Sequence, residues 1–381
     1  MSSGPVGQVP RSVGFNESAG PDGVPDGPNE VPDADGAAIA APPASGSAGP
    51  WPSGSAGPWR TALGQLLRNR AAMAGAVVFV VVLVACLAAP LYAAKVAHTN
   101  AFRSNISGTT VVDGATVQVL ATSNTGLGLG VTPIGPTWDP AHYFLGADNQ
   151  GRDVMARLLY GGRNSLLIGL ASALLCCLLA TAIGILAGYA GGPIDAVLSR
   201  FLDVLWSVPV YLLAICLSVV LLTSGLRLGP IQIGAGSLWV PIVIIAVVYV
   251  PYVARPLRGQ VIVLRNREFI QAAVCVGASD TRILRRDVLP NVLPTVIVFV
   301  PLMTALGMLT ESALSFLSVG VQPPDASWGT IINDGLGLLY TRPIVTIAPG
   351  LFIAITAVAL NVLGDGLRDT LDPGARLRGG A

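Results

Sequence analysis

The sequence contains few charged residues. Asp, Glu, Lys and Arg make up only 11% of its 381 residues, whereas hydrophobic residues make up 52%. A soluble domain typically has about 25% charged residues. Because a soluble core does not need so much apolar sequence, the composition indicates an integral membrane protein that is embedded in a lipid bilayer. The net charge of +1 gives no indication of a nucleic-acid partner.

Lysine is nearly absent, since Lys95 is the only one. A P-loop has the pattern GxxxxGK[ST], because its lysine reaches the terminal phosphates of the nucleotide. Lys95 follows Tyr92, Ala93 and Ala94, without a glycine-rich loop. The sequence therefore excludes ATP binding and hydrolysis by that route, and any energy from ATP must come from another polypeptide.

Residues that could hold a metal ion are also scarce. The two histidines, His98 and His142, belong to no HExxH motif and to no His–carboxylate cluster. The five cysteines form no CxxC pair, and four of them lie inside apolar runs. We therefore expect no metal site, no catalytic residue and no cofactor bound by this chain.

Six apolar stretches are long enough to cross a membrane, which takes about 20 residues in a helix. We expect helices because backbone groups cannot remain unpaired in lipid. The six stretches together predict an all-α membrane protein, with a first transmembrane helix in 60–94 and a five-helix core in 161–370. The predicted spans are 71–94, a helix within 164–194, 204–226, 238–254, 288–310 and 343–364.

The segments before and between these spans differ in composition. Residues 1–59 are rich in Gly, Pro, Ser and Ala, and SGSAGPW occurs there twice. Such a sequence buries too little apolar surface to offset its ordering entropy, so we predict a disordered cytoplasmic tail. Residues 95–160 are predicted as an extracytoplasmic loop. Within it, Asp113-Gly114 between two β-rich runs predicts a β-hairpin with a two-residue turn.

The distribution of arginine predicts the orientation. With the N-terminus inside, fourteen arginines flank the spans on the inner side, and seven basic residues lie on the other side. This excess predicts that both termini are cytoplasmic, including a C-terminus at 371–381. Half of the fourteen arginines lie in one inner loop at 255–290.

That inner loop has the most specific pattern in the chain. Asn266 can cap a short helix, and Gly277 suits the end of that helix. Ser279 can cap a second short helix, which Leu289-Pro290 stops. The prediction is a pair of short helices whose small residues at the elbow let another protein backbone approach closely. The alternative is a basic loop that only satisfies the charge bias.

The spacing within this loop resembles the EAA loop of ABC importer permeases. Gln271-Ala272-Ala273 is followed after three residues by Gly277, and later by Leu289-Pro290. In that family the loop forms a coupling helix that seats in a cleft of the ATPase subunit. Glutamine stands here where the family has glutamate. The resemblance implies that the ATPase-coupling residues are Glu268, Gln271, Ala272, Ala273, Gly277, Ala278, Ser279, Leu289 and Pro290.

Four further blocks are similar to peptide and nickel permeases of the same family. Together the five blocks occur in order over roughly 140–375, and they resemble the C-type permease subunit of dipeptide, oligopeptide and nickel importers. The fold implied is that of a type I ABC importer permease. The four blocks are LGADNQGRD at 145–153, GYAGG at 188–192 with Asp195, Arg200 and Asp203, ESALSFLSVGVQPPDASWG at 311–329, and LGDGLRDTLDP at 363–373.

The resemblance implies a transmembrane subunit of an ATP-driven importer of di- or oligopeptides in the bacterial plasma membrane. A second permease subunit would complete the pathway, and two ATPase subunits would bind ATP and Mg. An extracytoplasmic peptide-binding protein would deliver the substrate. Nickel and glutathione are alternative substrates within the family. A solo secondary transporter would need midplane ionisable sites and internal repeats, and a membrane-embedded enzyme or sensor would need His, Asp or Ser constellations inside the spans.

Glycines near the end of the second span are candidates for helix packing. Gly184, Gly188 and Gly192 recur every four residues, so we expect them to share one helix face. Small residues at this spacing permit close packing of helices, and a gate or hinge is the functional alternative.

Polar residues at the outer ends of two spans are the remaining candidates. Glu311 lies where the fifth span leaves its apolar run, which makes it a candidate gate or pathway residue. Hydration at the interface or a capping bond would also explain it. Asp148, Arg152 and Asp153 are expected to form an ion pair that stabilises the loop before the second span.

Overall fold

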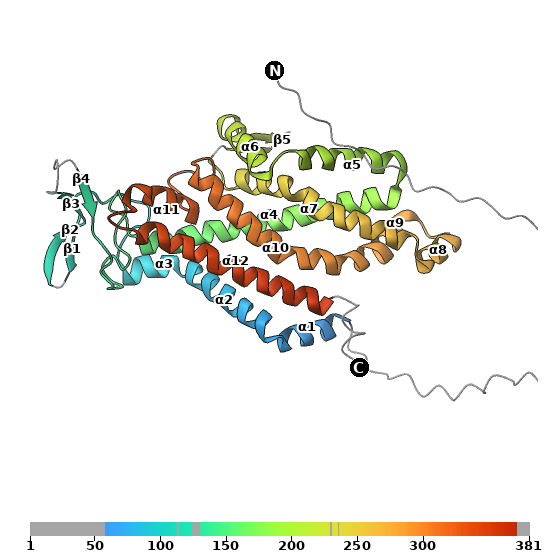
Figure 1. Cartoon of the computed structure of the whole chain (residues 1–381), viewed down its shortest axis with the longest axis horizontal. Coiled ribbons are helices and arrows are strands. Elements are labelled where there is room, and N and C mark those ends of the chain that lie inside the picture. The colour runs from blue at the N-terminus through green and yellow to red at the C-terminus, as the bar shows by residue number, and fades with distance from the viewer. Residues whose placement is uncertain (1–57, 113, 124–129, 229–230, 235, 372–381) are drawn as a thin grey trace, which may run out of the picture. The chain divides into compact units, whose positions relative to one another are not determined.

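The computed structural model describes residues 58–112, 114–123, 130–228, 231–234 and 236–371 (Figure 1). The predicted tail at 1–59 lies outside the described residues except for its last two, and the predicted C-terminus at 371–381 does so except for Leu371.

Helices make up most of the described chain. Five helical runs are long and apolar enough to cross a membrane, and a sixth span results if one bent helix pair is counted as one. This confirms the predicted all-α membrane protein with about six spans. The runs are α2 (Arg70–Leu87), α4 (Val154–Ala190), α7 (Trp239–Arg265), the stretch that ends in α10 (Leu289–Phe316), and α12 (Ile344–Leu371).

The bent pair differs from its prediction. A single span was expected at 204–226, but α5 (Gly192–Ser207) and α6 (Val210–Ser224) meet at an angle of 91°. Val208 between them is extended, with φ −96° and ψ 134°. A proline disfavours the helical conformation of the residue before it, so Pro209 breaks the helix there.

Helix α4 also begins earlier than expected. Its N-cap is Asp153, whose side chain accepts a hydrogen bond from the backbone of Ala156. The predicted outer loop at 95–160 is therefore shorter, because α4 begins within it at Val154. At its other end α4 stops at Ala190, where Gly191 has φ +64°.

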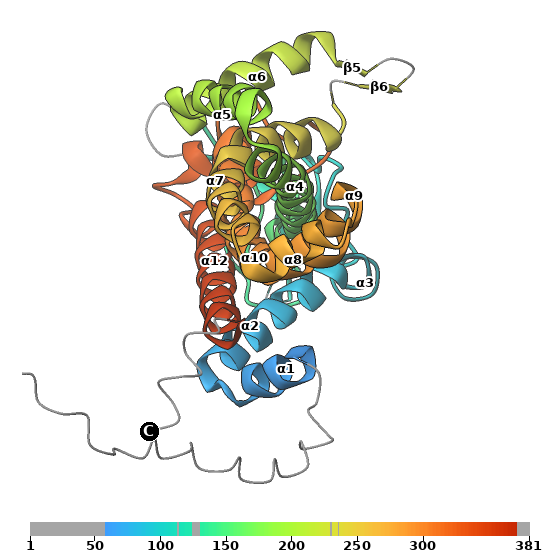
Figure 2. The same ribbon diagram turned by 90° about the vertical axis from the view of Figure 1, so that its right-hand side faces the viewer.

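Helix α4 is the packing centre of the bundle. It contacts α7 and α10 along its length, α10 contacts α12, and α12 contacts α2. Figure 2 shows α4 and α7 near the middle, with α5 and α6 on one side and α2 and α12 on the other. Side chains of α4, α7 and α10 form the main apolar core. Two exposed valines of α2, Val77 and Val81, fit a surface in contact with lipid.

Two of the predicted packing glycines lie where α4 meets α7. A Cβ atom on Gly184 would lie 3.0 Å from the Cβ of Leu257, and one on Gly188 would lie 2.7 Å from the Cβ of Val261. The prediction for Gly192 is wrong. This residue lies beyond α4, at the start of α5, and nothing lies within 4 Å of the position of its Cβ.

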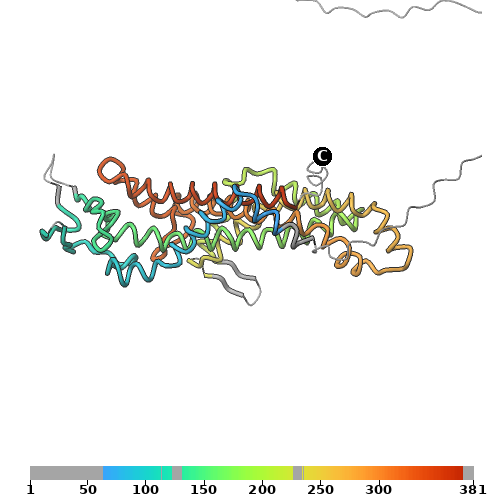
Figure 3. Tube along the Cα trace, turned by 90° about the horizontal axis from the view of Figure 1, so that it is seen from below, coloured from blue at the N-terminus to red at the C-terminus, as the bar shows by residue number. Residues whose placement is uncertain are grey.

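Short elements occupy the two ends of the bundle (Figure 3). We call the end that carries residues 109–133 the hairpin end, and the end that carries residues 268–283 the elbow end. The hairpin end carries the predicted β-hairpin, in which β1 (Thr109–Val112) pairs with β2 (Ala115–Gln118). Asp113 of its predicted turn lies outside the described residues. Two further hairpins were not predicted. One pairs β3 (Leu120–Ser123) with β4 (Gly130–Pro133) at the hairpin end. The other pairs β5 (Leu226–Leu228) with β6 (Ile231–Ile233) and lies next to the end of α6, away from β1–β4 (Figure 1).

The remaining short helices lie between or before the long ones. Two of them, α8 and α9, form the elbow end, and α11 lies at the hairpin end (Figure 1). Their bounds are α1 (Pro58–Arg68), α3 (Ala89–Leu91), η1 (Tyr92–Val96), α8 (Glu268–Cys275), α9 (Asp280–Ile283), η2 (Leu284–Val288), α11 (Trp328–Gly335) and η3 (Leu336–Leu338).

Candidate functional site

The elbow between α8 and α9 is closed by backbone hydrogen bonds. The Gly277 amide donates to the Val274 carbonyl over 2.9 Å, and the Ala278 amide donates to the Ala273 carbonyl over 3.0 Å. Gly277 has φ +80°. These two bonds and a left-handed residue form a Schellman motif, which ends a helix and turns the chain sharply. The elbow shape predicted around Gly277 is therefore present.

Most of the predicted coupling residues face outward from the elbow. Ala273 and Ala278 are partly buried against the core. Val276 is 88% exposed, and nothing lies within 4 Å of the position of a Cβ on Gly277. The exposed members of the set are Glu268, Gln271, Ala272, Gly277, Ser279, Leu289 and Pro290. The result is an open surface at the elbow end that combines small residues with the polar side chains of Glu268 and Gln271.

Three local predictions at the elbow need correction. Asn266 ends α7 instead of capping α8, and its side chain donates to the Ile262 carbonyl. Ser279 occupies the N-cap position of α9, but its side chain makes no capping hydrogen bond. Leu289-Pro290 does not stop the second short helix, because α9 and η2 continue directly into α10. Pro290 stands in the first turn of α10, directly after the π-helical turn η2.

The elbow is fixed to the bundle at a few points. Ile270 of α8 and Ile283 of α9 are fully buried in the main core. The Tyr189 hydroxyl near the end of α4 donates to the Asp280 carboxylate over 2.8 Å. This hydrogen bond joins α9 to the end of α4.

Ion pairs connect the bent helix pair to α7 near the elbow end. Arg258 of α7 binds both carboxylate oxygens of Asp195, over 2.5 and 2.6 Å. Arg255 binds Asp203 over 2.7 Å. Both aspartates belong to the GYAGG block described from the sequence. Their arginine partners were not predicted, because they lie more than 50 residues further along the chain.

At the hairpin end, Glu311 is fully buried among serines. The Ser165 hydroxyl donates to it over 2.8 Å and the Ser315 hydroxyl over 2.7 Å. Ser312 lies at 3.4 Å. Buried carboxylates need such partners, and serine hydroxyls of this chain supply them to Glu311. The candidate role in a pathway stays a prediction.

Ser165 also connects Glu311 to α11. Ser165 of α4 accepts a hydrogen bond from the Trp328 amide over 3.1 Å. The Trp328 indole is fully buried and donates to the Leu158 carbonyl over 3.0 Å. A Cβ on Gly162 would lie 2.8 Å from the indole ring. Glycine on α4 thus makes room for the tryptophan that seats α11.

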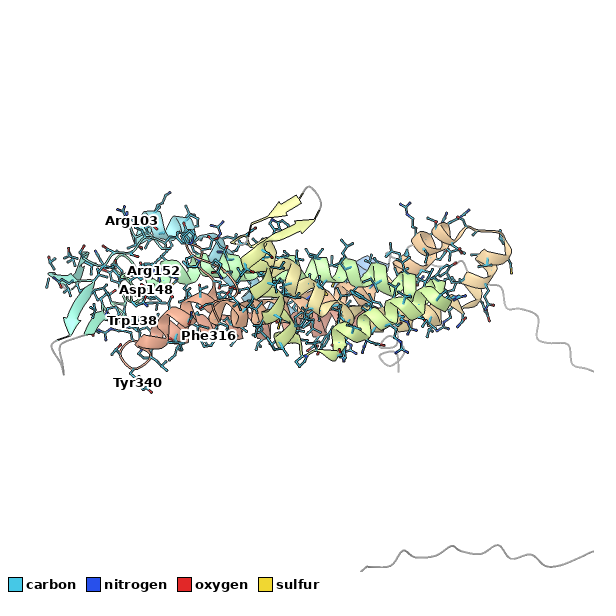
Figure 4. All side chains as sticks on the ribbon, turned by 90° about the horizontal axis from the view of Figure 1, so that it is seen from above. Arg103, Trp138, Asp148, Arg152, Phe316 and Tyr340 are labelled. Atoms are coloured by element: carbon cyan, nitrogen blue, oxygen red, sulfur yellow. The ribbon has the colours of Figure 1, made fainter. Side chains whose placement is uncertain are left out.

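A ring of four charges also holds α11 to the start of α4. Arg152 binds Asp148 over 2.7 Å and Asp334 over 2.9 Å, and Arg157 binds the same two carboxylates over 3.2 and 2.8 Å. Figure 4 labels Asp148 and Arg152 close together at the hairpin end. The predicted pair is therefore present, but Arg157 and Asp334 were missed. Burial raises the pKa of Asp334, and the charge of Arg152 opposes that rise.

Asp153 has a role separate from this ring. Besides capping α4, it accepts a hydrogen bond from the Thr99 hydroxyl over 3.0 Å. Burial raises its pKa, and these hydrogen bonds oppose the rise. Among the residues that the structure describes, no three His, Cys, Asp or Glu side chains are grouped to hold a metal ion.

Comparisons with known proteins identify two family matches. Residues 180–377 match the model of the family described as binding-protein-dependent transport system inner membrane component. Residues 57–105 match the N-terminal TM domain of oligopeptide transport permease C.

Three curated relatives are similar over much of their length. The oligopeptide transport system permease protein OppC of Haemophilus influenzae is 38% identical over 62% of this chain and 72% of its own. The glutathione transport system permease protein GsiD of Pectobacterium atrosepticum is 38% identical over 61% and 72%. The dipeptide transport system permease protein DppC of Bacillus subtilis is 40% identical over 62% and 70%.

Proposed function

The chain belongs to the family of binding-protein-dependent transport system inner membrane components, and from this premise we propose that it forms half of an ATP-driven import pathway for di- or oligopeptides. It is a multi-pass membrane subunit of a peptide ABC importer. Separate subunits with ATP and Mg would supply the energy, because this chain has no P-loop lysine.

The observation that carries the coupling role is the open elbow between α8 and α9. Its Schellman turn presents Gly277 at a position where, apart from its two chain neighbours, no described residue lies within 4 Å of a Cβ. We assign ATPase docking to this surface and to the exposed predicted residues around it. Each of two ATPase subunits would seat one such elbow, one on this chain and one on a second permease subunit.

Helix α4 would carry the movement of the elbow across the membrane. It has 37 residues, which correspond to about 55 Å of continuous helix. Near its elbow end, Tyr189 binds Asp280, and near its hairpin end it holds α11 through Trp328 and the charge ring. Closing of the ATPases would therefore move α11 at the opposite face, which gives alternating access by a rigid connection.

The proposed orientation places the elbow end in the cytoplasm of a bacterial cell, together with both termini. The excess of arginine on that side supports this orientation. An extracytoplasmic peptide-binding protein would then deliver its substrate to the hairpin end, where β1–β4 and α11 lie.

Glutathione is a second candidate substrate, because a glutathione permease is as similar to this chain as an oligopeptide permease. Nickel remains an alternative from the sequence resemblance. Competition of unlabelled tripeptide, glutathione and nickel against uptake of a labelled tripeptide separates the three.

Purification of the tagged chain in mild detergent tests the assembly. Identification of the co-purified proteins by mass should find a second permease and P-loop ATPases. Recovery of the chain alone, or of a complex without an ATPase, would contradict the proposal and favour the secondary-transporter alternative.

A further inference from the structure

An apolar groove of about 590 Å³ runs between α2 and α12. The two helices cross closely, because Gly75 faces the Ala359 carbonyl and Gly366 faces Ala72. A Cβ on Gly75 would lie only 2.7 Å from that carbonyl oxygen. The close crossing leaves a furrow beside it, whose lining includes Ala71, Ala74 and Val358.

The groove is continuous with the surface that faces lipid. Every residue that lines it has an apolar side chain or is glycine. Val358 on its rim is 62% exposed, and the neighbouring Val81 of α2 is 61% exposed. The small residues of the crossing, Ala72 and Gly75, are already buried by α12. What remains open is a narrow apolar furrow whose rim carries the branched side chain of Val358, and such a furrow suits a flexible hydrocarbon chain.

Two arginines stand where the groove reaches the membrane surface. Asn69 caps α2 by accepting from the amides of Ala71 and Ala72, so the chain bends there and α1 leaves the axis of α2. Arg68 ends α1 and Arg70 begins α2. Both are exposed, and neither makes an ion pair with another described residue.

The position of Arg70 connects this charge to the groove. Arg70 precedes Ala74 by four residues, so the two lie on the same face of α2. Leu63 and Leu67 of α1 are each 58% exposed beside this junction. Figure 2 shows α1 next to the ends of α2 and α12. The mouth of the groove thus combines two arginines with further apolar surface, and one exposed carboxylate, Asp369, lies on the same face of α12 as the lining Val362.

We propose that this groove binds an anionic phospholipid, with one acyl chain between α2 and α12 and the phosphate at Arg68 and Arg70. Basic residues at the membrane surface attract anionic headgroups, and their long side chains reach the headgroup level while their stems stay apolar. In the proposed orientation the lipid belongs to the cytoplasmic leaflet. A helix of another subunit would fill the furrow without needing the two arginines, so the charge favours the lipid.

The test places the full chain in nanodiscs of equal parts phosphatidylglycerol and phosphatidylcholine and measures retained lipid by native mass spectrometry. The chain should retain phosphatidylglycerol preferentially. The double change Arg68→Gln and Arg70→Gln should reduce this preference about fivefold for each arginine. Arg200→Gln removes the same charge from an exposed site elsewhere on the elbow-end half, and it should leave the preference unchanged.

A second pair of variants tests the acyl-chain groove. Ala74→Phe fills the groove and should abolish retention of both lipids, whereas Val80→Phe adds the same ring to an exposed position on the opposite face of α2 and should not. Circular dichroism checks that each variant is folded, and Ala71→Leu replaces Ala74→Phe if it is not. Absence of retained lipid, or retention that none of these changes affects, would overturn the proposal. So would cross-linking of Ala74→Cys to another subunit in the complex co-purified with the tagged chain, with no lipid retained.

Discussion

A carboxylate at position 277 tests directly whether another protein seats against the elbow. Gly277 has φ +80°, and among the described residues only its chain neighbours come within 4 Å of the position of its Cβ. The change Gly277→Asp therefore causes no clash within the protein, and its local backbone cost is at most about 1–2 kcal/mol. Any weakening of ATPase association must therefore come from contact between the new carboxylate and residues of the partner.

The expected magnitude follows from packing at the docked interface. Extra side-chain atoms in a well-packed contact cost about 1–3 kcal/mol, which corresponds to a roughly 5- to 150-fold weaker association of the ATPase subunits. Gly277→Asn is a shape control, because asparagine tolerates positive φ and has the same size without the charge. It should weaken association less than Gly277→Asp does.

The chain offers a matched control on the opposite side of the bundle. Gly114 also has φ +80°, and nothing lies within 4 Å of the position of its Cβ. Gly114→Asp should therefore fold equally well and leave ATPase association unchanged. Binding is measured by titrating purified ATPase onto the tagged chain in nanodiscs, alongside peptide uptake. If Gly277→Asp binds and transports within twofold of wild type, the coupling role of the elbow is refuted.

Three stability predictions concern the contacts that join the helices, and each is read from the midpoint of thermal unfolding in detergent. Gly188→Ala should destabilise the protein by about 1–3 kcal/mol through overpacking, whereas Gly259→Ala, which meets open space, should not; equal midpoints would contradict the close contact of α4 with α7. Trp328→Phe should cost about 2 kcal/mol, because it removes a buried hydrogen bond and shrinks a buried ring. An unchanged midpoint would mean that the indole does not hold α11. Asp334→Asn should cost roughly 1–3 kcal/mol by removing a carboxylate that two arginines share, and Asp325→Asn nearby should cost less than half of that.

The elbow could be predicted because its causes are local in sequence. A Schellman turn depends on a few neighbouring residues and on glycine at one position, so Gly277 and its neighbours determine the shape themselves. The hairpin of β1 and β2 was predictable for the same reason. The ion pair of Asp148 with Arg152 lies within four residues and was also found.

Contacts between distant segments were not predictable from one sequence. Asp334 joins the charge ring from α11, 182 residues after Arg152. Ser165, which satisfies Glu311, comes from α4 and lies 146 residues before it. No local pattern indicates which buried partner a polar residue will meet. The sequence therefore made Glu311 a gate or pathway candidate, with hydration or a capping bond as the alternatives, and did not indicate the serines that bind it.

The broken third span was missed although its signal was present. The apolar run at 204–226 is long enough for one helix, and this length outweighed the proline within it. Pro209 and the β-branched residue before it indicate a break, and the structure has a 91° bend there. Gly192 was grouped with two packing glycines by spacing alone, but α4 ends before it.

ATP-dependent peptide uptake tests the central claim most directly. The chain is reconstituted in liposomes with its co-purified permease, ATPase subunits and peptide-binding protein, and accumulation of a radiolabelled tripeptide is measured with and without ATP. We expect accumulation only with ATP and the binding protein, and its loss with Gly277→Asp. Accumulation without ATP, or driven by an ion gradient alone, would contradict the assignment as an ATP-driven importer.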